Sequence, residues 1–123
     1  MDNAQEYWLY DLKVETVVGD RSPVCRHIEG EFFLVEGETL VFSQPTKISM
    51  YALAALLPLL PAKQRQTDIA DWMSTDAEVA CPDPHCGGRF RITRTRKRNF
   101  TNAGTTGLPE SRDTPYWAKE NSE

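Results

Sequence analysis

The sequence predicts an α+β fold, a small antiparallel sheet with one or two short helices, a cysteine-bearing hairpin and an extended C-terminal arm. Three observations favour this class. Apolar and polar residues alternate over residues 10–18, which is typical of a half-buried strand. Residues 50–57 are rich in alanine and leucine, which are strong helix formers. Two cysteines, Cys81 and Cys86, stand between two further β-like runs.

The first three predicted strands form an antiparallel meander. The first, residues 10–18, ends at the turn pair Gly19-Asp20. Gly30 precedes the second strand, residues 31–35, and the pair Glu36-Gly37 turns the chain into the third strand, residues 39–42. The loop between the first two strands contains Pro23, Cys25 and His27.

A helix is predicted over residues 50–57, with Ser49 as its N-cap, since a serine hydroxyl accepts a hydrogen bond from an unpaired backbone N–H. Pro58 and Pro61 end or kink it. The helix is apolar nearly all round, so it must be covered by other elements or by another subunit. A second short helix is expected to start near Thr67 and to contain Ile69, Trp72 and Met73.

Two further strands, residues 78–80 and 90–95, flank the loop CPDPHCGG. In the second of these, Phe90 and Ile92 should face inward while Arg89, Arg91 and Thr93 face outward. Residues 1–100 are thus expected to form one metal-stabilised α+β domain. Residues 101–123 show no periodicity but carry Leu108, Tyr116 and Trp117, which predicts an extended arm that contacts partner subunits.

The cysteines and histidines fall into two short clusters, which predicts one structural metal site, with zinc as the expected ion, formed by Cys25, His27, Cys81 and Cys86. Zinc prefers thiolate and imidazole ligands in a closed tetrahedron, commonly supplied as two short-range pairs. Pro82 and Pro84 stiffen the loop, and Gly87 and Gly88 would let backbone N–H groups approach the sulfurs, as in zinc-ribbon hairpins. His85 is the alternative fourth ligand, in place of His27.

Other interpretations of these residues remain open at this point. Cys81 and Cys86 can form a redox-labile disulfide, or all three cysteines can be inert buried thiols. A small stand-alone enzyme that uses an open metal, or Cys25 with His27 as a nucleophile pair, is a further alternative. No Walker loop, dinucleotide fingerprint or Ser-His-Asp pattern is visible, so independent catalysis has no motif behind it.

Positive charge is concentrated in residues 89–98 (RFRITRTRKR), which carry six basic residues and no acidic ones in a chain of net charge −4. Such a run can bind nucleic acid in a zinc ribbon, but its one aromatic residue, Phe90, is expected to face inward, which leaves no stacking platform among the basic side chains. Nucleic acid is therefore the less favoured partner. We expect one solvated strand face that pairs with an acidic protein surface.

The chain is expected to be cytoplasmic. Its N-terminal residues, MDNAQEYW, lack the basic and apolar regions of a signal peptide. In a reducing compartment, clustered cysteine and histidine more often mean a metal than a disulfide. The most apolar stretch, residues 48–62, is too short to span a bilayer and contains two prolines, so no membrane partner is expected.

The order of these features resembles a group of small bacterial proteins. A β-rich start with Cys25-x-His27 is followed by YALAALLPLLPAKQR (51–65) and VACPDPHCGGRFRI (79–92). Over about residues 7–100 the chain is similar to the small β subunits of acetophenone carboxylase, which is related to the acetone carboxylase and hydantoinase-type ATP-dependent complexes. The spacings of both Cys/His pairs differ from the two CxxC-like pairs of the acetone carboxylase small subunit.

This resemblance implies a non-catalytic, zinc-binding subunit of a biotin-independent, ATP-dependent carboxylase that converts an aromatic ketone, acetophenone, to benzoylacetate. Cys25, Cys81 and Cys86 would be carried over as ligands of the structural zinc. ATP and Mg²⁺ or Mn²⁺ would be bound by other, larger subunits, which this chain would hold together.

Overall fold

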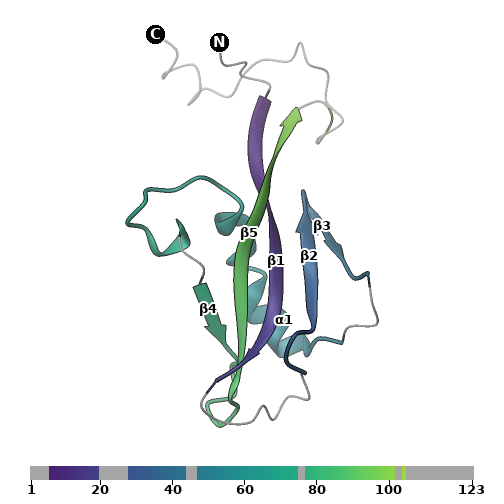
Figure 1. The fold of residues 1–123 in the computed structure, drawn as a ribbon, viewed down its shortest axis with the longest axis vertical. Helices are drawn as coiled ribbons and strands as arrows, with labels where there is room; N and C mark the ends of the chain where they lie inside the picture. Colours follow the sequence, from purple (N-terminus) through teal and green to yellow (C-terminus); the bar gives the residue numbers. More distant parts are fainter. Residues whose placement is uncertain (1–5, 20–27, 44–46, 75–76, 102–103, 105–123) are drawn as a thin grey trace.

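A computed structural model describes residues 6–19, 28–43, 47–74, 77–101 and 104. Its elements, in chain order, are β1 (Glu6–Val18), β2 (Phe32–Glu36), β3 (Thr39–Val41), α1 (Met50–Leu56), α2 (Leu60–Lys63), the 3₁₀ helix η1 (Trp72–Ser74), β4 (Ala77–Ala80) and β5 (Gly88–Thr101). The strands form one antiparallel sheet in the order β3-β2-β1-β5-β4, with the helices packed against it (Figure 1). The α+β class is confirmed.

Strands β1 and β5 form a long two-stranded ribbon through the centre of the sheet (Figure 1). They pair from Glu6 opposite Thr101 to Val18 opposite Gly88. The register shifts once, where Asp11 faces Arg96 but Leu12 faces Arg94. The extra residue in β5 is a β-bulge, which locally changes the face to which each side chain points.

Helix α1 begins where the sequence predicts. Ser49 is its N-cap, and the Ser49 hydroxyl accepts from the backbone N–H of Tyr51 at 3.2 Å and of Ala52 at 3.5 Å. After α1, the short helix α2 has Pro61 in its first turn, where a missing N–H costs nothing. Pro58 follows the end of α1, as expected, whereas Pro61 begins a second helix that the sequence analysis did not predict.

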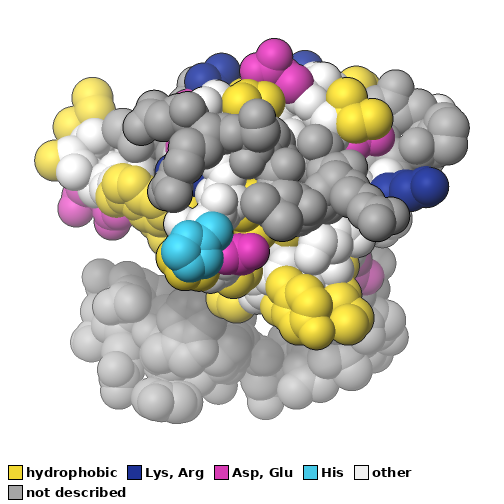
Figure 2. Space-filling view, turned by 90° about the horizontal axis from the view of Figure 1, so that it is seen from below, with side chains coloured by type: hydrophobic (Ala, Val, Ile, Leu, Met, Phe, Trp, Pro, Cys, Tyr) yellow, Lys and Arg dark blue, Asp and Glu magenta, His cyan; other side chains and the backbone are white. Residues whose placement is uncertain are grey.

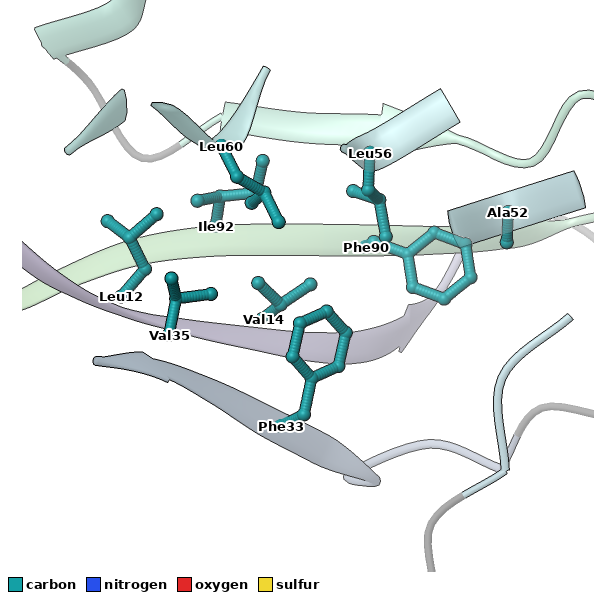
Figure 3. Packing of buried hydrophobic residues seen from close by; sticks show 9 residues of the cluster. All are labelled: Leu12, Val14, Phe33, Val35, Ala52, Leu56, Leu60, Phe90 and Ile92. Carbon is teal, nitrogen blue, oxygen red and sulfur yellow. The ribbon is translucent and has the colours of Figure 1, made fainter. Parts of the chain in front are cut away.

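The core lies between the sheet and these helices (Figure 3). It is built from alternate residues of three strands and from one side of α1 and α2: Leu12, Val14, Phe33, Val35, Ala52, Leu56, Leu60, Phe90 and Ile92. The inward prediction for Phe90 and Ile92 is confirmed, since they are 3% and 0% exposed. Burying these side chains removes apolar surface from water, which is the main force that holds the layers together.

Two predictions need correction. The second helix expected from Thr67 is wrong, because only η1 forms there and Ile69 is 93% exposed. The described chain covers only one side of α1, since Ala52 and Leu56 are buried but Met50 and Tyr51 are 71% and 67% exposed, so cover by another subunit stays a prediction. The last strand is longer than predicted, because β5 continues to Thr101 by pairing with β1. No helix in the described parts of the chain is long and apolar enough to cross a membrane.

Candidate metal centre

The two cysteines of the predicted hairpin lie together at one end of the sheet. Cys81 directly follows β4, and Cys86 lies two residues before β5. The Cys81 N–H donates to the Gly88 carbonyl at 3.2 Å, and the Cys86 N–H donates to the Asp83 carbonyl at 3.0 Å. These bonds fold the intervening residues into a tight turn. Both side chains are buried, at 9% and 3% exposure, and they are thiols that are not bonded to each other.

The sulfur of Cys86 has a backbone donor. The Gly88 N–H points to Cys86 Sγ at 3.4 Å, the approach that was expected from the paired glycines. Hydrogen bonds to a sulfur ligand are part of the outer shell that orients and tunes a metal site. The same bond stabilises negative charge on sulfur, and the thiolate is the form that binds metal.

The exposed part of the turn is polar and stiff. Pro82, Asp83, Pro84 and His85 are all exposed, and the Asp83 carboxylate accepts from the His85 N–H at 2.9 Å. Figure 2, which views the molecule from the lower end of Figure 1, shows the histidine of the described residues at the surface beside an acidic side chain. His85 therefore lies on the turn but outside the buried space of the two sulfurs.

The end of β1 packs directly against this turn. The Gly19 N–H donates to the Gly87 carbonyl at 2.8 Å, and a Cβ on Gly19 would lie 2.9 Å from that oxygen. Glycine is required here because two backbones approach this closely. On the other side of the β1–β2 connection, Glu29 accepts from the Val18 N–H at 3.4 Å. The residues that flank 20–27 are thus anchored at the end of β1 that pairs with the start of β5.

Cys25 and His27, the other half of the predicted site, lie outside the described residues. Within the described part of the chain, no group of three or more Cys, His, Asp or Glu side chains is placed to hold a metal. The structure therefore brings together Cys81 and Cys86, with His85 on the same turn. A closed zinc tetrahedron needs two further ligands beyond the two thiols.

The basic run of β5 does not form one solvated face, so that prediction is wrong. Directly opposed residues of an antiparallel pair share a face. Arg94 and Lys97 lie opposite Leu12 and Tyr10, whereas the other four basic residues share the opposite face. Alternation alone already divides the run between two faces, and the bulge between Arg94 and Arg96 moves Arg96 and Arg98 to the face of Arg89 and Arg91.

Each of the six basic side chains also has a partner within the chain. Arg94 donates to the Lys63 carbonyl at 2.8 Å and to the Arg65 carbonyl at 2.6 Å, and its guanidinium lies 4.6 Å from the Tyr10 ring centre. Lys97 lies 3.3 Å from Gln66 Oε1 and 5.8 Å from the Trp8 ring centre. These contacts dock the α2 end onto the β1–β5 ribbon.

The remaining four basic residues pair on the other face of the sheet. Arg96 and Arg98 both contact the Asp11 carboxylate, at 3.1 and 2.7 Å, and Asp11 is only 5% exposed. Arg91 pairs with Glu78 at 2.8 Å, and Arg89 donates to the Gly88 carbonyl at 2.9 Å. Sequence reasoning missed this role, because the acidic partner Asp11 is distant in the chain. The run is used to hold strands together, which weakens the case for a nucleic-acid surface.

Comparison with known proteins adds no assignment. No protein-family model, curated protein sequence or solved structure matches this chain.

Proposed function

We propose that this chain is a non-catalytic, zinc-binding structural subunit of a multi-subunit, ATP-dependent and biotin-independent carboxylase that acts on an aromatic ketone, acetophenone, in the cytoplasm. The observation that carries the structural role is the pair of buried cysteines, Cys81 and Cys86, on one turn, with a backbone N–H directed to one sulfur. The carboxylase itself rests on the sequence resemblance given above. ATP and Mg²⁺ or Mn²⁺ would bind to the other subunits.

The donor set fits a structural zinc. Cys81 and Cys86 offer two buried sulfurs on one turn, and thiolates are the preferred ligands of such sites. We infer that Cys25 and His27 complete the set, with His85 as the substitute for His27. The ion would then join residues 25–27 to the 81–86 turn and close the connection between β1 and β2 onto the sheet. Its chemistry there is to hold the chain, since a closed tetrahedron leaves no position for substrate.

The surface of α1 supports a docking role. The solvent side of this helix presents Met50, Tyr51 and Ala54, all of them exposed. The opposite side, with Ala52 and Leu56, is fully buried on the sheet. A continuous apolar strip of this kind marks a protein-protein contact more often than a free surface. We infer that the larger carboxylase subunits cover this strip and that the C-terminal arm, with Tyr116 and Trp117, extends the contact.

Co-purification tests this proposal. The affinity-tagged chain, expressed with its neighbouring genes, should bring down larger ATP-binding subunits, and the complex should carboxylate acetophenone only when ATP and this chain are present. Tyr51→Asp places a charge in the apolar strip and should reduce recovery of those subunits at least tenfold. Ile69→Asp is the matched control, since Ile69 is an exposed apolar residue outside α1. A stable monomer that recovers no ATP-binding subunit would contradict the assignment.

Metal analysis tests the zinc separately. About one zinc per chain is expected in protein purified without added chelator. If the complex assembles although this chain contains no metal, the proposed accessory role is supported and the proposed zinc site is refuted. The two parts of the proposal can therefore fail independently.

A further inference from the structure

A groove of about 480 Å³ lies at the opposite end of the helical layer from the cysteine turn. Its walls come from the first residues of β1, the β2–β3 turn, the C-cap of α1, α2 with the two residues that follow it, and the end of β5. The lining is mainly apolar and includes Tyr7, Leu57, Leu60 and Phe100, with Gln64 among its polar residues. A groove of this size and composition suits one or two apolar side chains of a peptide segment.

The groove has a preformed floor. The rings of Tyr7 and Phe100 stack with centres 5.5 Å apart. Gly37, at φ +64°, brings the β2–β3 turn against Phe100, where a Cβ would lie 3.2 Å from the ring. The Gln64 side chain fixes that turn by donating to the Gly37 carbonyl at 2.6 Å. A rigid apolar site binds with little ordering cost, because its side chains are already placed.

The chain itself leaves the described structure at this groove. Gly104 is one of the lining residues, and its N–H donates to Thr101 Oγ1 at 3.1 Å. The next apolar residue in the sequence is Leu108, four positions further on, followed by Pro109. Four residues span at most about 14 Å, so Leu108 lies no further than this from Gly104, which itself lines the groove.

Because it is tethered to the domain, this segment is favoured over a separate partner as the occupant of the groove. A short flexible connection gives the attached segment an effective concentration of the order of 1 mM at the groove. A segment with a local Kd of about 0.1 mM would therefore occupy the groove about nine-tenths of the time. An untethered ligand of equal affinity would need a comparable real concentration to compete.

We propose that the groove is the docking site for the base of this chain's own C-terminal arm, with the Leu108 side chain seated among Leu57, Leu60 and Phe100. This contact anchors the arm in cis and directs the following residues, with Tyr116 and Trp117, away from a fixed point on the domain. The proposal requires neither the metal nor the carboxylase complex.

Hydrogen exchange on the full-length chain tests it. Leu108→Asp places a charge in the apolar groove and should make backbone amides of the β2–β3 turn and of residues 57–65 exchange about tenfold faster, as expected for loss of a ligand present nine-tenths of the time. Ser111→Asp adds the same charge to the same arm, outside the docked segment, and should leave these rates unchanged. Circular dichroism should show an intact fold in both variants.

A substitution in the groove itself provides a second, reciprocal test. Leu57→Ala lowers the affinity of the groove without a charge, and it should accelerate exchange in the arm at residues 105–108 but add little to the effect of Leu108→Asp on the groove. Equal exchange in the wild-type and Leu108→Asp chains would overturn the proposal. So would protection that appears only as dimers form with rising protein concentration, since the arm would then come from a second copy.

Discussion

Replacing Cys86 by alanine distinguishes a metal ligand from an inert buried thiol. The Cys86 side chain is 3% exposed and accepts the Gly88 N–H. If the sulfur is only a small hydrophobe, the substitution deletes one buried atom and costs about 1 kcal/mol, whether or not metal is present. If it is a zinc ligand, the chain also loses the free energy of metal binding.

The contribution of metal binding to the free energy of unfolding follows from the thermodynamic linkage between binding and folding. A metal that binds the folded chain alone stabilises it by about 2.7 kcal/mol when its free concentration is one hundred times Kd, and by about 4.1 kcal/mol at one thousand times Kd. We therefore expect Cys86→Ala to cost about 4 kcal/mol or more in zinc buffer, but about 1 kcal/mol after chelation. Cys81→Ala should behave in the same way, since Cys81 lies on the same turn.

Urea unfolding, followed by tryptophan fluorescence, measures these four free energies in wild type and variant, with zinc and with chelator. Two further variants identify the fourth ligand, because His27→Ala and His85→Ala should differ in their response to zinc. The ligand variant should respond weakly, and the other should respond like wild type. A wild-type chain whose stability is the same in zinc and in chelator would refute the metal site, and so would an equal zinc response in Cys86→Ala.

Three further predictions follow from particular contacts. Gly19→Ala should destabilise the chain by about 1–3 kcal/mol in urea unfolding, because its Cβ would meet the Gly87 carbonyl at 2.9 Å; unchanged stability would contradict this close approach. Ser49→Ala should cost about 1 kcal/mol by removing the α1 cap, whereas Ser49→Asp, which also caps, should cost little. Arg94→Met removes the charge-assisted hydrogen bonds to the Lys63 and Arg65 carbonyls and should cost about 1.5–3 kcal/mol of stability per lost bond. The variant should therefore have a lower Tm. An unchanged Tm would show that these bonds add nothing to stability.

Local patterns predicted the parts of the fold that depend on local physics. The apolar alternation of β1 gives Leu12 and Val14 in the core, and the same rule in β5 buries Phe90 and Ile92. The Ser49 cap follows from hydrogen bonds within three residues. Each of these features is decided by residues that are close in the chain, so the sequence alone contains the necessary information.

Features that depend on cross-strand contacts were not predictable in this way. Alternation places Asp11 on the solvent side of β1, yet it is 5% exposed because Arg96 and Arg98 close over its carboxylate. The shift in register that places Arg96 opposite Asp11 lies in β5, more than eighty residues from Asp11 in the sequence. Neither the bulge nor the ion pairs leave a signal in the local pattern of either strand.

The same distinction between local and cross-strand features applies to the candidate metal site. Cys81 and Cys86 meet because one tight turn joins them, and that turn consists of the six consecutive residues 81–86. The approach of the β1–β2 connection to this turn depends instead on the pairing of Val18 with Gly88 across the sheet. The sequence suggests the second ligand pair by residue type alone, which is weaker than a spacing enforced by a turn.

The internal use of the basic run changes which surface is available to a partner. All six positive side chains of β5 already contact groups of the same chain, so an acidic partner would have to compete with Asp11, Glu36 and Glu78. The α1 strip offers no charge at all, and Met50 and Tyr51 are its most exposed members. Burial of apolar area is largely insensitive to screening, whereas contacts between exposed charges weaken within a Debye length of about 8 Å at physiological salt. Association through α1 would therefore persist at high salt, and association through β5 would not.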